Sequence, residues 1–218
     1  GAVAAMMGNA SEYYHFYHTG RYSYKTFIWG SGYEDQMNKN IMLNGLPMIY
    51  YSLTMAGLFS SRDIMIASDS SAHNNRLQEL LGDGSRFGMR INYCIKNKNR
   101  LFTLRDQMEW LDGDRLLTLN EDEFCFGNGF DSMIYRRLKR FDGAYCFEAT
   151  RADNSSHVMK RLGISAYDLD VSGIIKKTCE KNENASMIDV DDVYRSEHKF
   201  FTDRFRRGIV CSEFDNKD

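Results

Sequence analysis

The sequence predicts an α/β fold in which a mainly parallel central sheet is flanked by helices. The first observation is that strand-like apolar runs alternate with helical patterns through the first two thirds of the 218 residues. Such alternation is typical of right-handed βαβ units, whose crossover helices lie on a parallel sheet. The second observation is a glycine turn, Gly30-Ser31-Gly32, directly after the first strand-like run. A turn without bulky side chains lets a ligand approach the backbone closely.

The individual elements follow in chain order. Strands are expected near residues 25–29, 63–68, 90–95 and 115–119, and helices near 48–58, 72–82, 101–111 and 130–140. In the helix near 72–82, Leu77, Leu80 and Leu81 recur at helical spacing, which predicts a half-buried helix lying on the sheet. Gly82 is expected to end this helix because glycine accepts a left-handed backbone, and Asp83 is expected to serve the turn. A further strand is expected at 143–150 and a further helix at 170–181.

Composition favours one globular domain at residues 24–218, behind an N-terminal extension of residues 1–23 whose first residues resemble a vector remnant. A net charge of −2 gives no electrostatic reason to bind nucleic acid or an anionic membrane. No apolar run reaches membrane-spanning length. The five cysteines are scattered and never spaced as Cys-x-x-Cys, which is typical of free thiols in a reducing compartment. We therefore expect a cytoplasmic protein.

Acidic residues after a later strand are a second candidate for binding. Asp122 follows the apolar run near 115–119 and lies between Glu121 and Glu123. Ligands gather at the carboxyl ends of strands in open α/β sheets, and neighbouring carboxylates favour a bound cation or shifted pKa values. Asp122 is thus a candidate metal ligand, and the alternative is an acidic loop that faces water. His73 has no recognisable nucleophile turn beside it and is interpreted as a surface or capping residue.

Several segments, in register along the chain, carry a resemblance to a known family. They are KTFIWGSG at 25–32, LPMIYY at 46–51, DIMIAS at 63–68, LLGDGSRFGMRINY at 80–93 and LLTLNEDEFCFGNGF at 116–130. Together they resemble sugar-1-phosphate nucleotidyltransferases, and the glucose-1-phosphate thymidylyltransferases in particular. The match is strong over residues 24–140 and thin afterwards, where YDLDV at 167–171 and RRGIV at 206–210 resemble late landmarks. The resemblance implies a nucleotide-diphospho-sugar-transferase-like (Rossmann-like) fold.

The resemblance also implies a reaction, in which a nucleoside triphosphate and a sugar-1-phosphate give a nucleotide sugar and pyrophosphate. Because these reactants are anions, a divalent metal and protein cations must screen their charge. The residues implied are Gly30, Ser31 and Gly32 at the phosphates, Lys39 and Asp122 in catalysis, and Asp122 with Glu213 or Asp215 at Mg²⁺. Lys39 has a second interpretation as a solvated loop lysine. Homo-oligomer formation is left open.

The sequence departs from the family pattern in three places. The family has a threonine and an arginine that bind the triphosphate, where this chain has the acidic Glu34-Asp35. The nucleobase loop is shortened to residues 95–100, whose basic side chains can touch a phosphate. The sugar-binding Glu-Glu-Lys-Pro motif is missing, with Lys160 or Arg161 as a stand-in for its lysine. We expect a shortened family member whose activity is weak or lost. The alternative is a catalytically impaired homologue that binds a nucleotide or nucleotide sugar, or acts as a partner subunit.

Overall fold

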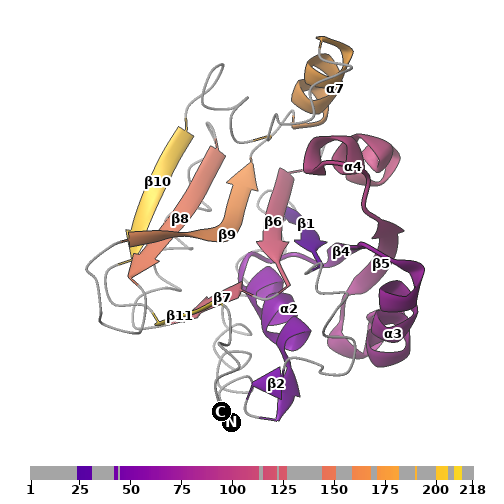
Figure 1. Cartoon of the computed structure of the whole chain (residues 1–218), viewed down its shortest axis with the longest axis vertical. Helices are drawn as coiled ribbons and strands as arrows, with labels where there is room; N and C mark the ends of the chain where they lie inside the picture. The colour runs from indigo at the N-terminus through magenta and orange to yellow at the C-terminus, as the bar shows by residue number, and fades with distance from the viewer. Residues whose placement is uncertain are drawn as a thin grey trace.

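The main α/β body of the chain is described by a computed structural model (Figure 1). The described residues are 24–30, 42–43, 45–112, 115–121, 123–126, 144–150, 159–167, 171–181, 190, 200–205 and 209–212. The N-terminal extension and the helix expected near 130–140 lie outside these ranges. Both therefore stay predictions.

Strands and helices alternate in the first half of the chain, and strands dominate the second half. The first half contains β1 (Tyr24–Trp29), β2 (Met42–Leu43), β3 (Leu46–Pro47), α2 (Met48–Leu58), β4 (Asp63–Ser68), α3 (Ser71–Leu81), the 3₁₀ turn η2 (Ser85–Phe87), β5 (Arg90–Ile95), α4 (Arg100–Asp106) and α5 (Met108–Leu111). The second half contains β6 (Arg115–Asn120), β7 (Glu123–Phe126), β8 (Ala144–Thr150), β9 (Met159–Tyr167), α7 (Val171–Lys181), β10 (Phe200–Phe205) and β11 (Ile209–Ser212).

Seven strands form the central sheet in the order β10-β8-β9-β6-β1-β4-β5 (Figure 1). Strand β1 lies between β4 and β6 and runs parallel to both, and β5 runs parallel to β4. Strand β9 is antiparallel to its neighbours β6 and β8, while β10 runs parallel to β8. In this sheet β9 alone reverses direction, so the predicted mainly parallel sheet is confirmed.

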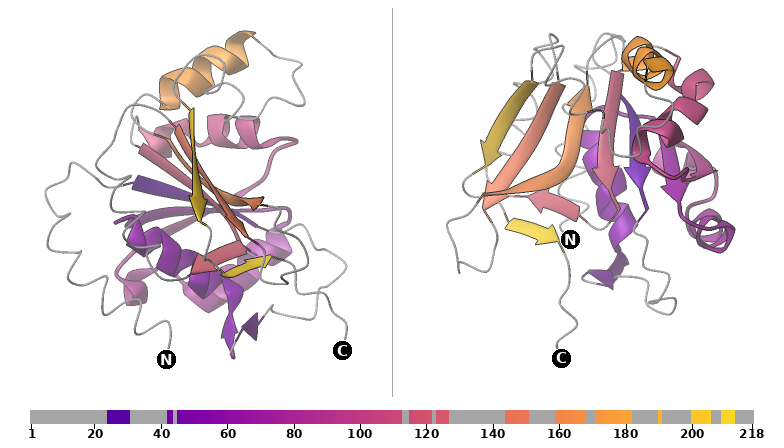
Figure 2. Two further views of the ribbon diagram at one scale, coloured as in Figure 1. Left: turned by 90° about the vertical axis from the view of Figure 1, so that its left-hand side faces the viewer. Right: turned by 45° about the horizontal axis from the view of Figure 1, so that its top comes forward.

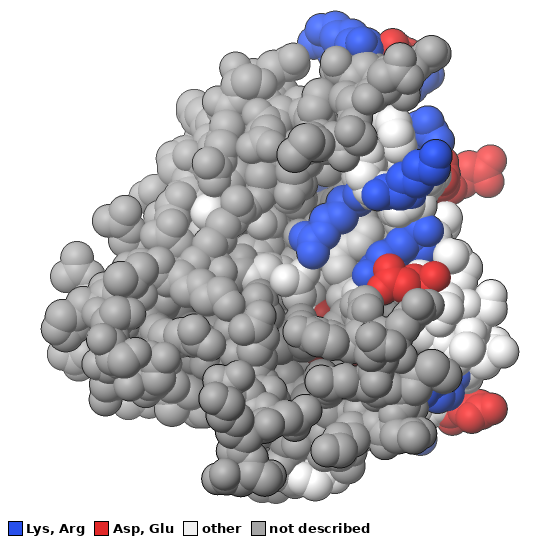
Figure 3. Space-filling view, in the orientation of Figure 1, with Lys and Arg blue, Asp and Glu red and all other residues white. Residues whose placement is uncertain are grey.

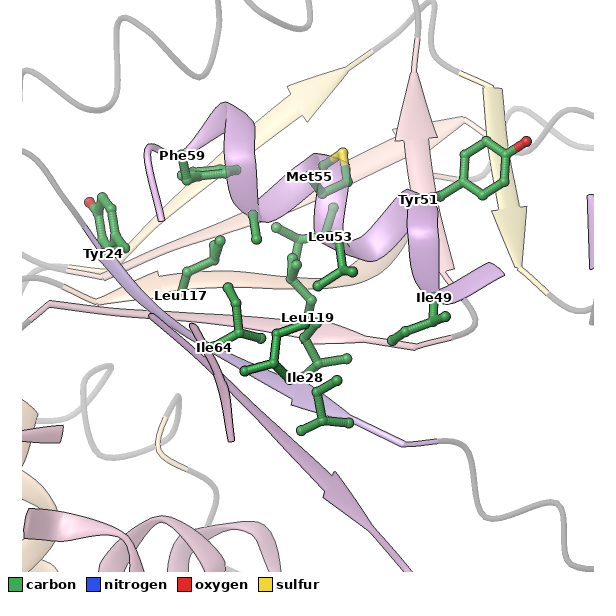
Figure 4. Close-up of a cluster of buried hydrophobic side chains, with 14 of the residues drawn as sticks. Tyr24, Ile28, Ile49, Tyr51, Leu53, Met55, Phe59, Ile64, Leu117 and Leu119 are labelled. Carbon is green, nitrogen blue, oxygen red and sulfur yellow. The ribbon is translucent and has the colours of Figure 1, made fainter. Parts of the chain in front are cut away.

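Helices cover both faces of the sheet: α2 and α3 lie on one side, and α4 and α7 on the other (Figure 2). On the α2 side, the strands contribute Ile28, Ile64 and Leu117, which are completely buried. Figure 4 shows these side chains facing those of α2, including Leu53 and Met55. Burying a side chain of this size stabilises the fold by about 1.5–3 kcal/mol. The cluster therefore fixes α2 against the middle of the sheet.

The opposite face uses the intervening residues of the same strands. Phe27, Trp29 and Leu116 belong to a second buried cluster, together with Leu101 of α4 and Ile175 of α7. Because successive strand residues point to opposite faces, neighbours such as residues 27 and 28 enter different clusters. Burial on both faces explains why these strands read as continuous apolar runs in the sequence.

Most of the predicted elements are confirmed, and one helix is not. Gly82 ends α3 with a φ of 62°, as predicted. The Asp83 carboxylate accepts the Ser85 N–H at 2.9 Å, so Asp83 serves the turn as predicted. The single helix expected at 101–111 is wrong, because α4 and α5 are separated at Gln107, whose φ of −112° lies outside the helical range. Strands β9 and β10 were not predicted.

Two further predictions concern the cysteines and the length of the helices. Cys94, Cys146 and Cys179 are free thiols, as their scattered positions predicted. None of the helices in the described ranges has the length and apolar character needed to cross a bilayer.

Candidate functional site

The carboxyl ends of β1 and β6 lie side by side where the connections of the sheet change direction. From β1 the chain moves outward to β4 and β5, and then returns to place β6 on the other side of β1. In open α/β sheets, ligands bind beside such a strand pair. The parallel strands are β1, β4, β5 and β6. We name the residues at or just after their carboxyl ends the carboxyl edge: Gly30, Asp69, 96–100, Asn120 and Glu121.

Gly30 is the first residue after β1 and lies against the backbone of β4. Its N–H donates to the Ala67 carbonyl at 2.7 Å, and its own carbonyl accepts from Lys96 Nζ. A Cβ at this position would lie 2.7 Å from the Ala67 oxygen and 3.3 Å from Glu121 Oε2, so a side chain would force these groups apart. The close approach therefore requires glycine. Both backbone polar atoms of Gly30 have partners within the protein.

Glu121 directly follows β6 and brings a carboxylate next to Gly30. Its Oε1 lies 3.5 Å from His73 Nε2 of α3, a contact that becomes an ion pair when the imidazole is protonated. The hydroxyl of Ser52 in α2 donates to the Glu121 carbonyl at 3.2 Å, and the Glu121 N–H donates to the Trp29 carbonyl at 2.9 Å. These bonds fix the end of β6 against β1 and α2. A carboxylate held here opposes a bound phosphate unless a cation lies between them.

Lys96 brings positive charge to the carboxyl edge from the end of β5. Its Nζ lies 3.0 Å from Asp69 Oδ1, and Asp69 directly follows β4. The Lys96 N–H donates to the Ser68 carbonyl at 2.8 Å, which continues the β4–β5 pairing by one step. Lys96 is thus held in place, and its charge is balanced by Asp69.

Arg100 is the first residue of α4 and reaches across to the ends of β1 and β6. Its guanidinium carbon lies 5.0 Å from the ring centre of Trp29, and its Nη2 donates to Asn120 Oδ1 at 3.0 Å. Asn99 caps the helix by accepting the Phe102 N–H at 2.8 Å, which fixes where α4 begins. In the orientation of Figure 3, Lys and Arg side chains gather over the region of α4 and β5.

Two buried polar atoms near this edge have no hydrogen-bond partner among the described residues: Ser68 Oγ at the end of β4 and Asn74 Oδ1 in α3. The Asn74 amide nitrogen donates to the Cys94 carbonyl at 3.2 Å, which places this side chain over β5. Burial, with a smaller contribution from Asp106, raises the pKa of the Cys94 thiol to about 11. An unpaired buried polar atom costs about 1–3 kcal/mol.

The structure describes Gly30 among the residues that the resemblance implied, and it lies directly after the central strand β1. The others lie outside the described residues: Ser31, Gly32, Lys39, Asp122, Glu213 and Asp215. Their roles stay predictions. Lys160 and Arg161 lie in β9, paired with Ala149 and Glu148 of β8. Within the described ranges, no three His, Cys, Asp or Glu side chains come together as a metal cluster.

Neither Asp69 nor the contact between His73 and Glu121 was predicted from the sequence. Asp69 had a usable signal, because it follows a predicted strand just as Asp122 does. The His73 contact had none, because the two residues come from distant segments that only the fold brings together.

Two curated proteins are similar to this chain in sequence. The glucose-1-phosphate thymidylyltransferase of Neisseria gonorrhoeae is 29% identical over 126 residues, which are 56% of this chain and 41% of that protein. The enzyme of the same name from Neisseria meningitidis is 29% identical over 105 residues, 46% of this chain and 35% of that protein. The match thus spans about two fifths or less of these relatives. No protein-family model matches the chain.

Solved structures share the fold over most of the chain. A putative glucose-1-phosphate thymidylyltransferase from Bacillus anthracis has a TM-score of 0.68 and 16% identity, covering 86% of this chain and 88% of its own. A 4-diphosphocytidyl-2C-methyl-D-erythritol synthase from Anaerococcus prevotii has a TM-score of 0.61 at 13% identity, covering 85% and 89%. The inositol-1-phosphate CTP transferase from T. maritima has a TM-score of 0.60 at 8% identity, covering 89% and 90%.

These structures define the class, an α/β protein with the nucleotide-diphospho-sugar-transferase fold. Within this class, the sequence similarity to the two thymidylyltransferases indicates which group of proteins the chain is related to. The chain is a relative of the sugar-1-phosphate nucleotidyltransferases.

Proposed function

We propose that the carboxyl edge binds a nucleoside triphosphate or a nucleotide sugar. The observation that carries this proposal is the meeting of Gly30, Lys96, Arg100 and Glu121 at the ends of β1 and β6. Gly30 has no room for a side chain, which is typical of a turn beside a phosphate. Lys96 and Arg100, from the short connection between β5 and α4, are cations that favour a ligand carrying phosphate. The reaction from which this site descends joins a sugar-1-phosphate to the nucleotide and releases pyrophosphate. The similarity to two thymidylyltransferases makes thymidine nucleotides the first ligands to test.

A magnesium ion is part of this proposal, with Asp122 as its ligand and Glu213 or Asp215 as the second carboxylate. The described neighbour Glu121 fits this choice of metal, because its carboxylate offers oxygen ligands at the same strand end. When bound, Mg²⁺ supplies charge screening at the phosphates. Lys39 is proposed as the catalytic cation.

We propose further that turnover is weak or lost. In the described part of the edge, Asp69 balances the charge of Lys96, and Glu121 brings a further carboxylate next to Gly30, so part of the positive charge is offset. Nucleotidyl transfer needs positive charge around the reacting phosphate, and losing one well-placed group typically costs about 10²–10³ in rate. The same balance favours the alternative function, a homologue that binds a nucleotide or nucleotide sugar without turnover, or a partner subunit.

A cytoplasmic location is part of the proposal. The free thiols of Cys94, Cys146 and Cys179 support it, because reducing compartments keep cysteines in that form.

Binding and turnover are tested separately. Thermal-shift measurements with deoxythymidine triphosphate and deoxythymidine-diphosphoglucose, with and without Mg²⁺, should show stabilisation that increases with the metal. If no nucleoside triphosphate or nucleotide sugar stabilises the chain, the binding proposal is wrong. Pyrophosphate release from deoxythymidine triphosphate and glucose-1-phosphate should stay near background and disappear in Asp122→Asn. Robust turnover that survives Asp122→Asn would contradict both the weak activity and the metal assignment.

A further inference from the structure

We infer that Arg100 is the residue that binds the polyphosphate of the nucleotide. This inference rests on the proposed function and deepens it by naming the cation that contacts the ligand. Arg100 follows the short connection after β5, and its guanidinium lies at the ends of both strands of the central pair, over Trp29 of β1 and beside Asn120 of β6.

The charge of Arg100 is the first reason for this inference. Within the described part of the chain, its contacts are the neutral indole of Trp29 and the neutral amide oxygen of Asn120. Lys96 differs, because Asp69 balances its charge at 3.0 Å. Arg100 therefore adds positive charge at the carboxyl edge that no described carboxylate cancels.

The rigidity of Arg100 is the second reason. Trp29 is 3% exposed and packs against Phe27 with ring centres 4.5 Å apart, so Arg100 rests on a fixed surface. A guanidinium has five N–H donors in a planar fork that matches a phosphate group. One of them donates to Asn120, which leaves others for a ligand. Because the side chain is held in place, binding loses little conformational entropy.

Arg105 offers a matched control on the same helix. It is exposed, as Arg100 is, and its guanidinium carbon lies 4.7 Å from the ring centre of Phe102. It differs in that Asp106 pairs with it at 2.9 Å, and in its position at the other end of α4, away from the carboxyl edge. Arg100 and Arg105 thus both lie over an aromatic ring. Arg100 differs in lying at the carboxyl edge and in having no described carboxylate partner.

Isothermal titration of the full chain in Mg²⁺, with deoxythymidine triphosphate and with inorganic tripolyphosphate, tests the inference. Arg100→Gln should raise Kd for both ligands roughly tenfold to a hundredfold, since one charge-assisted phosphate contact is lost. Its Kd should also depend less on salt than that of the wild-type chain. Arg105→Gln should leave both Kd values within about twofold, because an exposed and paired cation contributes little. Arg100→Lys keeps the charge without the fork and should fall between.

The outcomes separate this inference from the proposed function. If the wild-type chain binds deoxythymidine triphosphate and Arg100→Gln binds it equally tightly, Arg100 is not the polyphosphate ligand and the proposed function stands. Binding of tripolyphosphate that depends on Arg100, without binding of any nucleotide, would show that Arg100 holds a polyphosphate and would overturn the proposal that the ligand is a nucleotide. Binding of neither ligand overturns both. A thermal melt of each variant verifies folding, and Arg100→Lys carries the comparison if Arg100→Gln is unfolded.

Discussion

The two edges of the central sheet use the same kinds of side chain in different ways. We name the starts of the parallel strands, with the groups that contact them, the amino edge. There the Asp63 carboxylate at the start of β4 accepts from Trp110 at 3.1 Å, from Asn92 at 3.3 Å and from Arg90. Lys25 at the start of β1 donates to the Trp110 carbonyl and lies over its ring. Each charged group in this network is held by another part of the fold.

The carboxyl edge is less complete. Within the part of the chain that the structure describes, Arg100 has neutral partners, and Ser68 Oγ and Asn74 Oδ1 are buried without a hydrogen-bond partner. Under the proposed function, the amino edge uses its charged groups to stabilise the sheet, whereas the carboxyl edge keeps the charge of Arg100 for a ligand. Sites of this kind are where natural proteins give up local stability for function.

The largest expected effect is at the amino edge, for Gly84→Ala. The backbone of Gly84 has a φ of 84°, and a Cβ would lie 2.5 Å from Ile91 Cγ1 and 2.9 Å from the Met89 carbonyl. Overpacking and a left-handed backbone together should lower the free energy of unfolding by about 3 kcal/mol. Gly45→Ala is the control, because its φ of 77° is similar and nothing lies within 4 Å. It should cost about 1 kcal/mol in urea unfolding. Equal losses would mean that the Ile91 contact does not matter.

The second prediction compares Asp63→Ala with Asp69→Ala. Asp63 holds three donors and its side chain is 14% exposed, so its removal should cost about 2 kcal/mol. Asp69 has the single partner Lys96 within the described residues and is 35% exposed, so its removal should cost under about 1 kcal/mol. Because Asp69→Ala leaves Lys96 unbalanced, it should also tighten tripolyphosphate binding. Urea unfolding and titration measure the two effects, and a larger stability loss in Asp69→Ala would break the contrast between the edges.

A smaller effect concerns Tyr93 on β5, whose hydroxyl donates to the Gly82 carbonyl at 2.7 Å. Burial, and after it the charge of Asp83, raises the pKa of Tyr93 from 10.0 to about 12. The folded chain therefore holds this proton more tightly than the unfolded chain. The resulting stability is complete below pH 10 and is lost as the pH rises toward 12.

Tyr93→Phe tests that pH dependence. At pH 8 the variant should be less stable by about 0.5–1.5 kcal/mol, because the Gly82 carbonyl loses its donor. Its urea midpoint should fall less steeply between pH 9 and pH 11 than that of the wild-type chain. Parallel slopes would show that Tyr93 does not titrate in this range.

The smallest effect leaves stability unchanged and concerns the reactivity of Cys94. With a pKa raised from 9.0 to about 11, its thiolate at pH 8 should be about a hundredfold scarcer than that of an unperturbed thiol. Iodoacetamide labelling followed by mass spectrometry should therefore modify Cys94 slowly in the folded chain. Labelling in urea, where burial is removed, is the control. Fast labelling of the folded chain would show that the carboxyl edge opens to solvent at this strand.

The sequence predicted β1, β4 and β6 because these strands are buried on both faces. Phe27 and Ile28 enter different clusters, so their strand reads as a continuous apolar run. Strand β9 was missed because Lys160, Arg161 and Gly163 interrupt any such run. The break between α4 and α5 was missed as well, because neither glycine nor proline marks Gln107.

The candidate site was predictable only where one short segment carries the signal. Gly30 was singled out because a glycine turn follows a strand, and Asp122 with its neighbour Glu121 because they lie at the end of another strand; their roles stay predictions. The stacking of Arg100 on Trp29 could not be predicted, because the two residues come from β1 and α4 and meet only after the sheet has formed. Local pattern thus predicts strand ends, and tertiary contact decides which side chains act together.

The chain has two tryptophans, and the fold places one at each edge of the sheet. The indole N–H of Trp110 is bonded to Asp63, while Trp29 lies under the guanidinium of Arg100. Indole emission changes with nearby charge and polarity, so each ring is an intrinsic fluorophore for its own edge. Trp110→Phe leaves a chain whose remaining fluorescence follows ligand arrival at Arg100. Trp29→Phe leaves one whose fluorescence follows the integrity of the amino-edge network, without any attached dye.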